Sequence, residues 1–373
     1  MERSCQDKNN PIKIAIVGGG PSGIYCAINL GDLFQKNNFI NYSVDIFDKS
    51  QVLRTLLPTG NGRCNITNNI FDTKEFASNY PRGEKFLYSV FARYFIPETL
   101  DFFRSIGVET YIQNDNRIFP KSNSSADVKA KMLNKLWSYK NIKLIHKAIF
   151  DYGELSGYDK IVISVGSKNT QNFLKTTGHE IIPFKKALCA LKIKDFKYPK
   201  GVSVQSSDGD FVFTENGISG PLAFKISSLN SRKDFPYDIT INLFNLDDIK
   251  KEILKNTKKS IGNIVSCFIP RSLAHIIVNN FDKKASEVSN KELESYTKLD
   301  LTVISTEPTG EIVNSGGINL NELDKNYKSK IKNNLWFIGE AVDVDGFCGG
   351  FNLQHCWSSA YIAACDIIKS VLN

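Results

Sequence analysis

The sequence predicts an α/β fold, and two patterns near the N-terminus carry that prediction. In residues 12–29, IKIAIVGGGPSGIYCAIN, an apolar run that suits a buried strand breaks at a cluster of glycines and continues as a helix-compatible segment. Residues 42–48, YSVDIFD, then alternate as a strand does and end in an acid. A strand, a tight turn, a helix and a second strand in this order are typical of a parallel, Rossmann-like sheet.

Each glycine of the first turn has a physical task. Gly18 allows the sharp turn, Gly20 lets backbone N–H groups approach a pyrophosphate, and Gly23 lets the helix pack closely against the strand. Pro21 and Ser22 open the helix, whose positive N-terminal end favours an anion. The turn is therefore predicted to hold the phosphates of a dinucleotide.

The second strand supplies the partner that such a site needs. Asp48 stands about where this fingerprint places a carboxylate for the ribose hydroxyls, and Lys49 follows it. The alternative is a structural turn followed by a solvated acid. Because strand, turn, helix, strand and acid follow one another in register, we predict a dinucleotide site here.

Length and composition are those of an ordinary globular protein. The chain has 373 residues, 42% apolar and 23% charged, enough for a large core and two or three compact units. No apolar run is long enough to span a membrane and the first ten residues are polar, so we expect a cytoplasmic protein without a membrane partner. Eight cysteines without CxxC pairs or even spacing predict neither a structural metal nor a disulfide framework.

A second glycine-rich segment follows at 58–68, PTGNGRCNITN. Its density of Gly, Asn and Thr excludes a regular helix and leaves backbone N–H groups free to meet a ligand, so we expect it to line the cofactor. The run GNGRCNITN resembles the GxGRCNxTN signature of the HI0933-like flavoproteins, a bacterial family also described as aminoacetone-oxidase-like or NAD(P)/FAD-dependent oxidoreductases. The resemblance implies that the dinucleotide is FAD and that Gly62, Arg63, Cys64 and Asn65 lie against it.

The middle of the first domain contains further elements. Residues 85–106 predict two helices joined at Pro97, with an aromatic stripe that we assign to the core. Arg117 lies in a segment that resembles the family's RxFPxS, and it is a candidate for holding a substrate or a phosphate, or for a surface ion pair.

Strands are expected at 142–149 and 160–165. The turn at Ser164 and Gly166 stands where the family has the turn that meets the adenosine half of FAD, and the resemblance also implies a cofactor contact at Ala148. His179, in the family's Gly-His context, is assigned a structural role.

Strand-like and helical patterns predict two inserted parts. Strands at 188–193, 202–205 and 210–214 predict a β-rich insertion, and the Lys- and Asn-rich stretch at 247–290 predicts a small helical module. Together with these two insertions, the resemblance implies a discontinuous, glutathione-reductase-type FAD-binding domain. The ranges are 1–187 and 312–373 for the FAD-binding domain, 188–245 and 299–311 for the β-rich domain, and 246–298 for the helical module.

The end of the chain resembles the same family. Residues 335–340, LWFIGE, predict a buried strand whose terminal carboxylate and backbone groups can meet a polyol. A Gly-Gly turn then opens a helix whose positive end can face an anion; a simple helix entry is the alternative. The block resembles the family's GExxDxxGxxGGxN, which implies that this helix end lies near the flavin N1–O2 edge and stabilises the reduced ring. The implied contact residues are Gly339, Glu340, Asp343, Gly350, Phe351, Asn352 and Leu353.

The resemblance implies an FAD-dependent oxidoreductase that transfers hydride through flavin N5. No second glycine fingerprint is present for a nicotinamide nucleotide, so NAD(P)H, as a transient reductant, would dock over the ring and leave. Cys64 is our candidate proton donor, with a small packed residue as the alternative. His355 is assigned to helix packing.

Three hypotheses about the function differ in the substrate that they assign. A small-molecule oxidase or ene-type reductase is one, and reduction of a uridine in large-subunit ribosomal RNA to dihydrouridine is another that the resemblance allows. A third is a flavin-bearing RNA-binding or scaffold protein without turnover. The net charge of +8 and a lysine run at 250–259 are compatible with RNA, with an anionic cofactor or with a merely Lys-rich composition.

Overall fold

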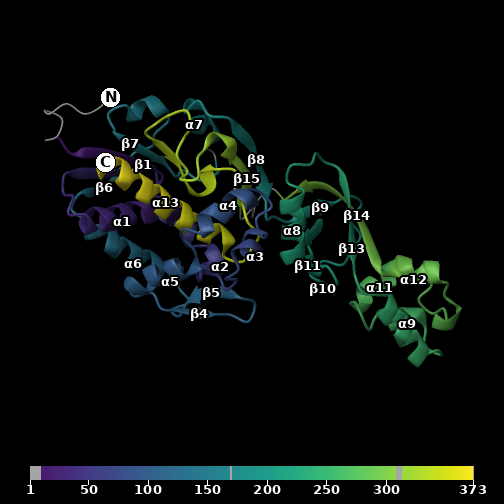
Figure 1. Cartoon of the computed structure of the whole chain (residues 1–373). Helices are drawn as coiled ribbons and strands as arrows, with labels where there is room; N and C mark the ends of the chain where they lie inside the picture. The colour runs from purple at the N-terminus through teal and green to yellow at the C-terminus, as the bar shows by residue number, and fades with distance from the viewer. Residues whose placement is uncertain (1–9, 169, 308–312, 373) are drawn as a thin grey trace. The chain divides into compact units, whose positions relative to one another are not determined.

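The computed structural model describes residues 10–168, 170–307 and 313–372 (Figure 1). The chain divides into two compact units, one made of Met1–Phe184 and Asn314–Asn373 and the other of Lys185–Val313. The domain boundary that we expected between residues 311 and 312 lies outside the described residues, and so does Cys5.

The first unit is built on a five-stranded parallel sheet with the strand order β16-β7-β1-β2-β6. Parallel strands are buried on both faces, which explains why these segments are rich in Ile and Val. The predicted α/β, Rossmann-like fold class is therefore confirmed. The strands are β1 (Ile12–Val17), β2 (Tyr42–Asp48), β6 (Ile142–His146), β7 (Lys160–Ile163) and β16 (Leu335–Phe337).

Two long helices from opposite ends of the chain pack against each other. They are α1 (Pro21–Lys36) and α13 (Phe351–Leu372), drawn in purple and yellow in Figure 1. Both present small or apolar side chains at helical spacing, and Trp357 of α13 packs against Tyr25 of α1 with tilted rings whose centroids are 5.0 Å apart. This packing joins the first and last parts of the sequence into one core.

Several expectations for the first unit need correction in detail. The break between α4 (Glu84–Phe91) and α5 (Ile96–Ser105) lies at 92–95, and Pro97 stands in the first turn of α5, where a missing N–H removes no helical hydrogen bond. The strand expected at 142–149 ends at His146. The remaining elements are η2 (Arg54–Leu56), α2 (Thr59–Gly62), β3 (Thr67–Asn68), α3 (Thr73–Ala77), β4 (Thr110–Ile112), β5 (Arg117–Pro120), α6 (Ser125–Trp137), η3 (Tyr152–Leu155), α7 (Gln171–Thr176), η5 (Leu320–Glu322) and η6 (Gly339–Ala341).

The second unit contains a six-stranded sheet in the order β10-β11-β12-β9-β14-β13, with antiparallel pairs. Strand β13 and helix α8 were not expected from the sequence; Gly220 and Pro221 start α8. The strands are β9 (Leu191–Ile193), β10 (Ser203–Ser206), β11 (Gly209–Phe213), β12 (Gly217–Ser219), β13 (Tyr237–Asn242) and β14 (Lys298–Thr306). The pair β8 (Ile181–Ala187) and β15 (Val313–Ile318) leads into and out of this unit.

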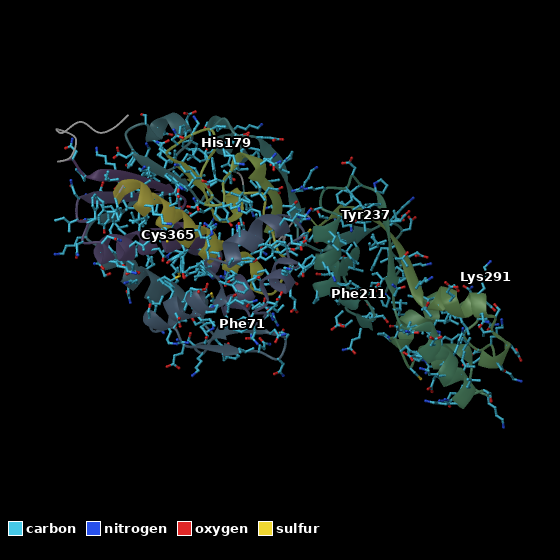
Figure 2. The ribbon with its side chains drawn as sticks, viewed as in Figure 1. Phe71, His179, Phe211, Tyr237, Lys291 and Cys365 are labelled. Atoms are coloured by element: carbon cyan, nitrogen blue, oxygen red, sulfur yellow. The ribbon has the colours of Figure 1, made fainter. Side chains whose placement is uncertain are left out.

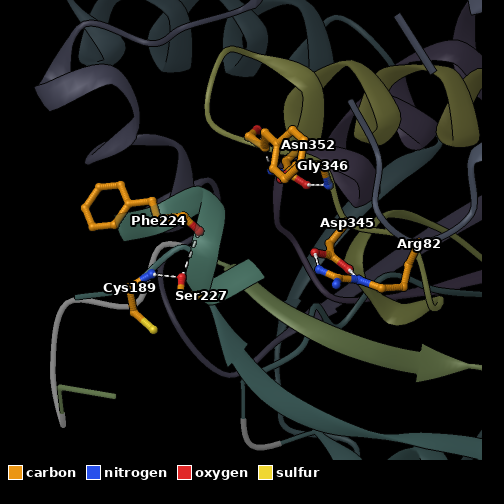
Figure 3. A network of polar contacts seen from close by, with 8 residues as sticks. Arg82, Cys189, Phe224, Ser227, Asp345, Gly346 and Asn352 are labelled. Carbon is orange, nitrogen blue, oxygen red and sulfur yellow. Dashed lines mark hydrogen bonds and ion pairs between the residues drawn. The ribbon is translucent and has the colours of Figure 1, made fainter. Parts of the chain in front are cut away.

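Sheet and helices of the second unit share one hydrophobic core. Phe211 of β11, labelled in Figure 2, belongs to the same buried cluster as Ile249 and Leu273 of the helices. The Ser227 hydroxyl accepts the Cys189 N–H at 3.0 Å and ties the start of the unit to α8 (Figure 3). The helices are α8 (Pro221–Leu229), α9 (Leu246–Lys255), α10 (Ile261–Val265), α11 (Arg271–Ile277), η4 (Ala285–Glu287) and α12 (Asn290–Tyr296). Division of this unit into a β-rich domain and a helical module stays a prediction.

Two kinds of feature are absent from the described residues. None of their helices combines the length and the apolar character that crossing a bilayer requires. In the same part of the chain, no group of three or more His, Cys, Asp or Glu side chains is placed to hold a metal ion.

Candidate functional site

The glycine turn between β1 and α1 packs so closely against backbone atoms at Gly18 and Gly23 that neither position has room for a side chain. Gly18 has a φ of +108°, and a Cβ added there would lie 2.4 Å from the carbonyl oxygen of Ser164. A Cβ added at Gly23 would lie 1.9 Å from the carbonyl oxygen of Gly18, so helix and strand approach through this glycine. A Cβ added at Gly20 would have room, with Thr55 Oγ1 as its one neighbour within 4 Å, at 3.8 Å. The turn thus has the close packing and the open backbone of a phosphate site.

Asp48 ends β2 directly beside this turn. Its Oδ2 accepts the Gly19 N–H at 2.7 Å, and its Oδ1 accepts the Ser50 N–H at 2.7 Å and the Ser50 hydroxyl at 2.9 Å. These bonds fix the carboxylate at the carboxyl end of the parallel sheet, where ligands of such sheets bind. Lys49 is exposed, and Ala148 lies beyond the end of β6, the strand that pairs with β2.

Ser164 and Gly166 follow β7 on the other side of β1. The Ser164 hydroxyl donates to the carbonyl oxygens of Gly18 at 2.8 Å and Val17 at 3.1 Å, and the residue is only 4% exposed. Ser164 therefore holds the glycine turn in shape. Gly166 has a φ of +71° and no atom within 4 Å of a Cβ added there.

The end of β16 meets the start of α1. A Cβ added at Gly339 would lie 2.4 Å from Ser22 Oγ, and the Gly339 N–H donates to Ser359 Oγ of α13 at 3.1 Å. Pro21 precedes Ser22 at the first position of α1. Residues more than three hundred positions apart therefore form one wall of the site.

Glu340 follows Gly339 in this wall. Burial raises the pKa of its carboxyl group, and the Ser167 hydroxyl, which donates to Oε2 at 3.2 Å, opposes that shift. Ser167 in turn accepts from Asn314 Nδ2 at 3.2 Å. The carboxylate is positioned by neighbours that leave it capacity to accept further hydrogen bonds, such as those of a polyol.

The signature loop is tied to the start of α13. The side-chain amide of Asn65 has one orientation in which both its oxygen and its nitrogen form hydrogen bonds. In that orientation the oxygen accepts the Gly350 N–H at 2.9 Å and the nitrogen donates to the Thr67 carbonyl at 2.9 Å. Asn68 Nδ2 donates to the Gly349 carbonyl at 2.9 Å. Gly350 has a φ of +93°, and a Cβ there would lie 2.5 Å from the Thr67 backbone. The two glycine-rich motifs, predicted separately, thus pack on each other.

The loop holds its central residues in unusual conformations. Gly62 and Cys64 have φ angles of +81° and +65°, and the Cys64 N–H donates to the Thr59 carbonyl at 2.9 Å. The Cys64 side chain is fully buried, which raises the pKa of its thiol to about 12. Arg63 is half-buried, and its Nε donates to the Gly60 carbonyl at 3.2 Å. The catalytic role of Cys64 stays a prediction.

The last predicted contact residues surround the turn before α13. Asn352 accepts the Gly346 N–H and donates to the Gly346 carbonyl, both at 2.8 Å (Figure 3), so its side chain closes this turn. Phe351 and Leu353 are buried in the core, and the Asp343 N–H donates to the Ile318 carbonyl at 3.0 Å. The structure brings these residues to one place but directs Phe351 and Leu353 inward.

Two residues of this site were missed from the sequence. Thr55 lies beside Gly20, and Ser167 binds Glu340. Both stand in irregular segments, where no hydrophobic period or glycine spacing indicates which hydroxyl turns toward the site. The place of Thr55 shortly after Asp48, the predicted ribose acid, is the one feature of the sequence that could have indicated it.

The surroundings of two histidines, His179 and His355, indicate a structural role. His179, labelled in Figure 2, is 7% exposed, and its Nε2 lies 2.7 Å from Ser329 Oγ. His355 Nε2 lies 3.0 Å from the Tyr327 hydroxyl, and burial lowers the pKa of His355 to about 3. Both arrangements agree with the packing roles expected for these residues.

His355 makes stability depend on pH. Its pKa is lower in the folded state than in the unfolded chain, so as the pH falls below about 6.5 only the unfolded state gains the proton. We expect this group to remove about 2 kcal/mol of unfolding free energy between pH 7 and pH 5. Urea unfolding at several pH values should show a shallower loss for His355→Gln than for the wild type. The same change at the exposed His146 is the control, and equal slopes for His355→Gln and wild type would contradict the prediction.

Comparison with known proteins gives one family and several relatives. A model of the HI0933-like protein Rossmann domain matches residues 12–366. A 3-dehydro-bile acid delta(4,6)-reductase from Clostridium scindens is 27% identical, with 94% of this chain and 98% of that protein covered. A ribosomal RNA dihydrouridine synthase from Escherichia coli is 24% identical, with 95% and 98% covered. The crystal structure of 3-ketosteroid delta1-dehydrogenase from Sterolibacterium denitrificans shares the fold, with a TM-score of 0.51, 12% identity and coverage of 97% and 100%.

Proposed function

Because this chain belongs to the family of HI0933-like proteins and is a flavin-dependent oxidoreductase, we propose that it reduces a carbon–carbon double bond conjugated to a carbonyl group. The names of the two relatives share this chemistry. One is a delta(4,6)-reductase of a 3-dehydro-bile acid, and the other makes dihydrouridine, which is uridine with hydrogen added across its ring double bond.

The contact between Ser22 and Gly339 is the observation that supports this proposal most. It brings the glycine turn, the Asp48 carboxylate and the Gly339–Glu340 strand end to one place, with the start of α13 nearby. The open backbone at Gly20 fits a pyrophosphate, Asp48 fits ribose hydroxyls and Glu340 fits the hydroxyls of a ribityl chain. FAD held by these residues would supply hydride through its N5, and NAD(P)H is the proposed source of that hydride.

The reaction also needs a proton, because hydride adds to one carbon of the double bond and a proton to the other. Burial keeps the Cys64 thiol protonated at neutral pH, since it raises the thiol pKa to about 12, and we keep Cys64 as the proposed proton donor. The N-terminal end of α13 carries the positive end of the helix dipole, which would stabilise negative charge at the site. Asn65, by binding the Gly350 N–H, fixes that helix end relative to the loop.

A small-molecule enone and a uridine of large-subunit ribosomal RNA are the two candidate substrates. The charge of +8 favours RNA, since phosphates attract a basic protein. For RNA, the target base would have to leave its stack to reach the site. Either substrate agrees with a cytoplasmic enzyme.

Anaerobic spectroscopy of the purified, FAD-loaded protein tests the proposed function. We expect NADH or NADPH to bleach the visible flavin absorbance and a conjugated enone, but not its saturated analogue, to restore it. Mass spectrometry should then show two hydrogens added to the acceptor. A reduced flavin that no conjugated acceptor reoxidises would contradict the proposal.

An experiment with ribosomal RNA distinguishes between the two candidate substrates. RNA isolated from cells that lack the protein, and digested to nucleosides after incubation with the reduced enzyme, should gain dihydrouridine if RNA is the substrate. The nucleoside profile of the untreated RNA should lack the same dihydrouridine. If incubation with the reduced enzyme leaves the nucleoside profile of this RNA unchanged, the proposed substrate is a small molecule.

A further inference from the structure

We propose that Arg63 and Arg117, gathered around Phe119, bind an anionic group of the substrate. The inference rests on the function proposed above and deepens it, because it assigns the substrate a carboxylate or phosphate that is held away from the reacting double bond. The group of Arg63, Phe119 and Arg117 is called the arginine cluster below.

The arginine cluster is built on a short antiparallel sheet. Arg117 and Phe119 are two residues apart on β5, so their side chains leave the same face of the strand. The Phe119 ring is fully buried, with the guanidinium carbon of Arg63 4.2 Å and that of Arg117 5.5 Å from its centroid. Both distances are within the range of cation–π attraction. A Cβ at Gly60 would lie 2.7 Å from the ring, so the signature loop packs directly on Phe119.

One of the two arginines in the cluster, Arg63, has no acidic partner among the described residues. Arg117 shares its charge with Asp115, whose Oδ2 accepts from Arg117 Nε at 2.7 Å. Arg63 donates from Nε to the Gly60 carbonyl, and within the described ranges no carboxylate pairs with its guanidinium. A half-buried guanidinium without an acid is costly to desolvate, and an anionic ligand would offset that cost.

The cluster lies beside the start of α13. Arg117 is the cross-strand partner of Asn68 in the β3–β5 pair, and Asn68 Nδ2 binds the carbonyl of Gly349. Asn68 is 4% exposed, and its Oδ1 has no hydrogen-bond partner among the described residues. A buried acceptor left open on the strand position opposite Arg117 points to a ligand that brings both an anion and a donor. Because the same turn precedes α13, this ligand would lie at the helix end that the proposed function assigns to the reaction.

Guanidinium geometry fits an oxyanion. Each arginine presents parallel N–H donors that match the two oxygens of a carboxylate or of a phosphate, whereas a lysine offers a single point charge. A carboxylate on a small acid and a phosphate of a nucleotide are two sources of this one chemistry. The experiment therefore includes both.

Steady-state kinetics with matched acceptors tests the inference. We expect Arg63→Met and Arg117→Met to raise KM for an enone that bears a carboxylate, or for uridine 5′-monophosphate, by about 10- to 100-fold. KM for the neutral enone or for uridine is measured in the same variants, and the ratio of the anionic to the neutral KM should rise by about 10-fold or more. The acceptor that shows the effect identifies carboxylate or phosphate as the source. Arg63→Lys and Arg117→Lys should restore only part of the affinity, because lysine keeps the positive charge but lacks the paired N–H donors of the guanidinium group.

Two controls distinguish anion binding by the cluster from a general loss of positive charge and from a loss of cofactor. Arg104→Met removes an arginine whose side chain is 72% exposed in an ion pair with Asp101, and it should change neither KM. FAD content and melting temperature are measured for every variant. Loss of FAD from Arg63→Met, with an unchanged KM ratio in Arg117→Met, would assign Arg63 to the cofactor and overturn the inference.

Direct binding distinguishes failure of this inference from failure of the proposed function. Calorimetric titration of the oxidised, FAD-loaded protein with uridine 5′-monophosphate, and separately with a steroid carboxylate, needs no turnover. Binding that the methionine variants lose would uphold the cluster even if no acceptor is reduced. Reduction of neutral and anionic acceptors with the same KM in the variants and the wild type would overturn the cluster and leave the proposed function intact.

Discussion

Replacing Gly23 by alanine is expected to abolish FAD binding, with affinity falling by about 100-fold or more. The new Cβ would lie 1.9 Å from the Gly18 carbonyl oxygen and 2.6 Å from Ser164 Oγ. The first of these atoms belongs to the backbone, so α1 and the glycine turn have to move apart. Overpacking of this kind typically costs about 1–3 kcal/mol, and it displaces the N–H groups that meet the pyrophosphate. Flavin absorbance of the purified protein, with and without added FAD, measures the loss.

Gly157→Ala is the matched control for Gly23→Ala. Its Cβ would meet no atom within 4 Å, and its φ lies outside the left-handed region. We expect this variant to keep its flavin and its melting temperature. Full FAD occupancy in Gly23→Ala would show that helix and strand do not need to approach closely, and would remove the main support for the phosphate site at this turn.

Replacing Arg82 by methionine should destabilise the protein by about 3–5 kcal/mol. Arg82 Nε donates to Asp345 Oδ1 at 2.6 Å, and a second nitrogen of the same guanidinium pairs with Oδ2 (Figure 3). The two side chains are 9% and 0% exposed. Without Arg82 the Asp345 carboxylate would lose a buried charge partner. Because Asp345 leads into the turn before α13, we also expect weaker FAD binding.

Urea unfolding measures the Arg82→Met effect, and Arg104→Met is the comparison. The Arg104–Asp101 pair is 72% and 69% exposed, and solvent screens it, so its loss should cost less than about 1 kcal/mol. A second test is Asp345→Asn in the Arg82→Met background, which removes the buried negative charge and should recover part of the stability. Equal unfolding free energies for Arg82→Met and Arg104→Met would contradict the expectation.

Local patterns predicted the framework of the first unit well. The strands at 12–17 and 42–48 and the helix between them lie where the apolar period and the glycines placed them. These features depend on neighbours in the sequence: a period of two or of 3.6 residues, and a glycine where φ is positive. The same rules failed where the patterns are weak. Helix α8 starts at a Gly-Pro pair that equally suits a turn, and the strand expected at 142–149 is shorter in the structure.

The candidate site could be predicted only in part, for a related reason. Motifs identified Asp48 and the Gly339–Glu340 pair, but not Thr55 or Ser167, which lie in segments without a regular period. The sequence also did not indicate which side chains of the site are buried. Cys64 looked like any thiol in a glycine-rich loop, and its complete burial follows from the packing of loop and helix around it.

The sequence by itself determined the class of fold, the family and the positions of both glycine-rich motifs, because each is carried by residues close together in the chain. Only the tertiary structure decided that Gly339 lies against Ser22, that Asn65 binds the N–H of Gly350 and that Arg63 and Arg117 share Phe119. These are contacts between segments far apart in the chain. Their partners are chosen by how the strands are ordered in the sheet and how α1 packs on α13, which no spacing within one segment specifies.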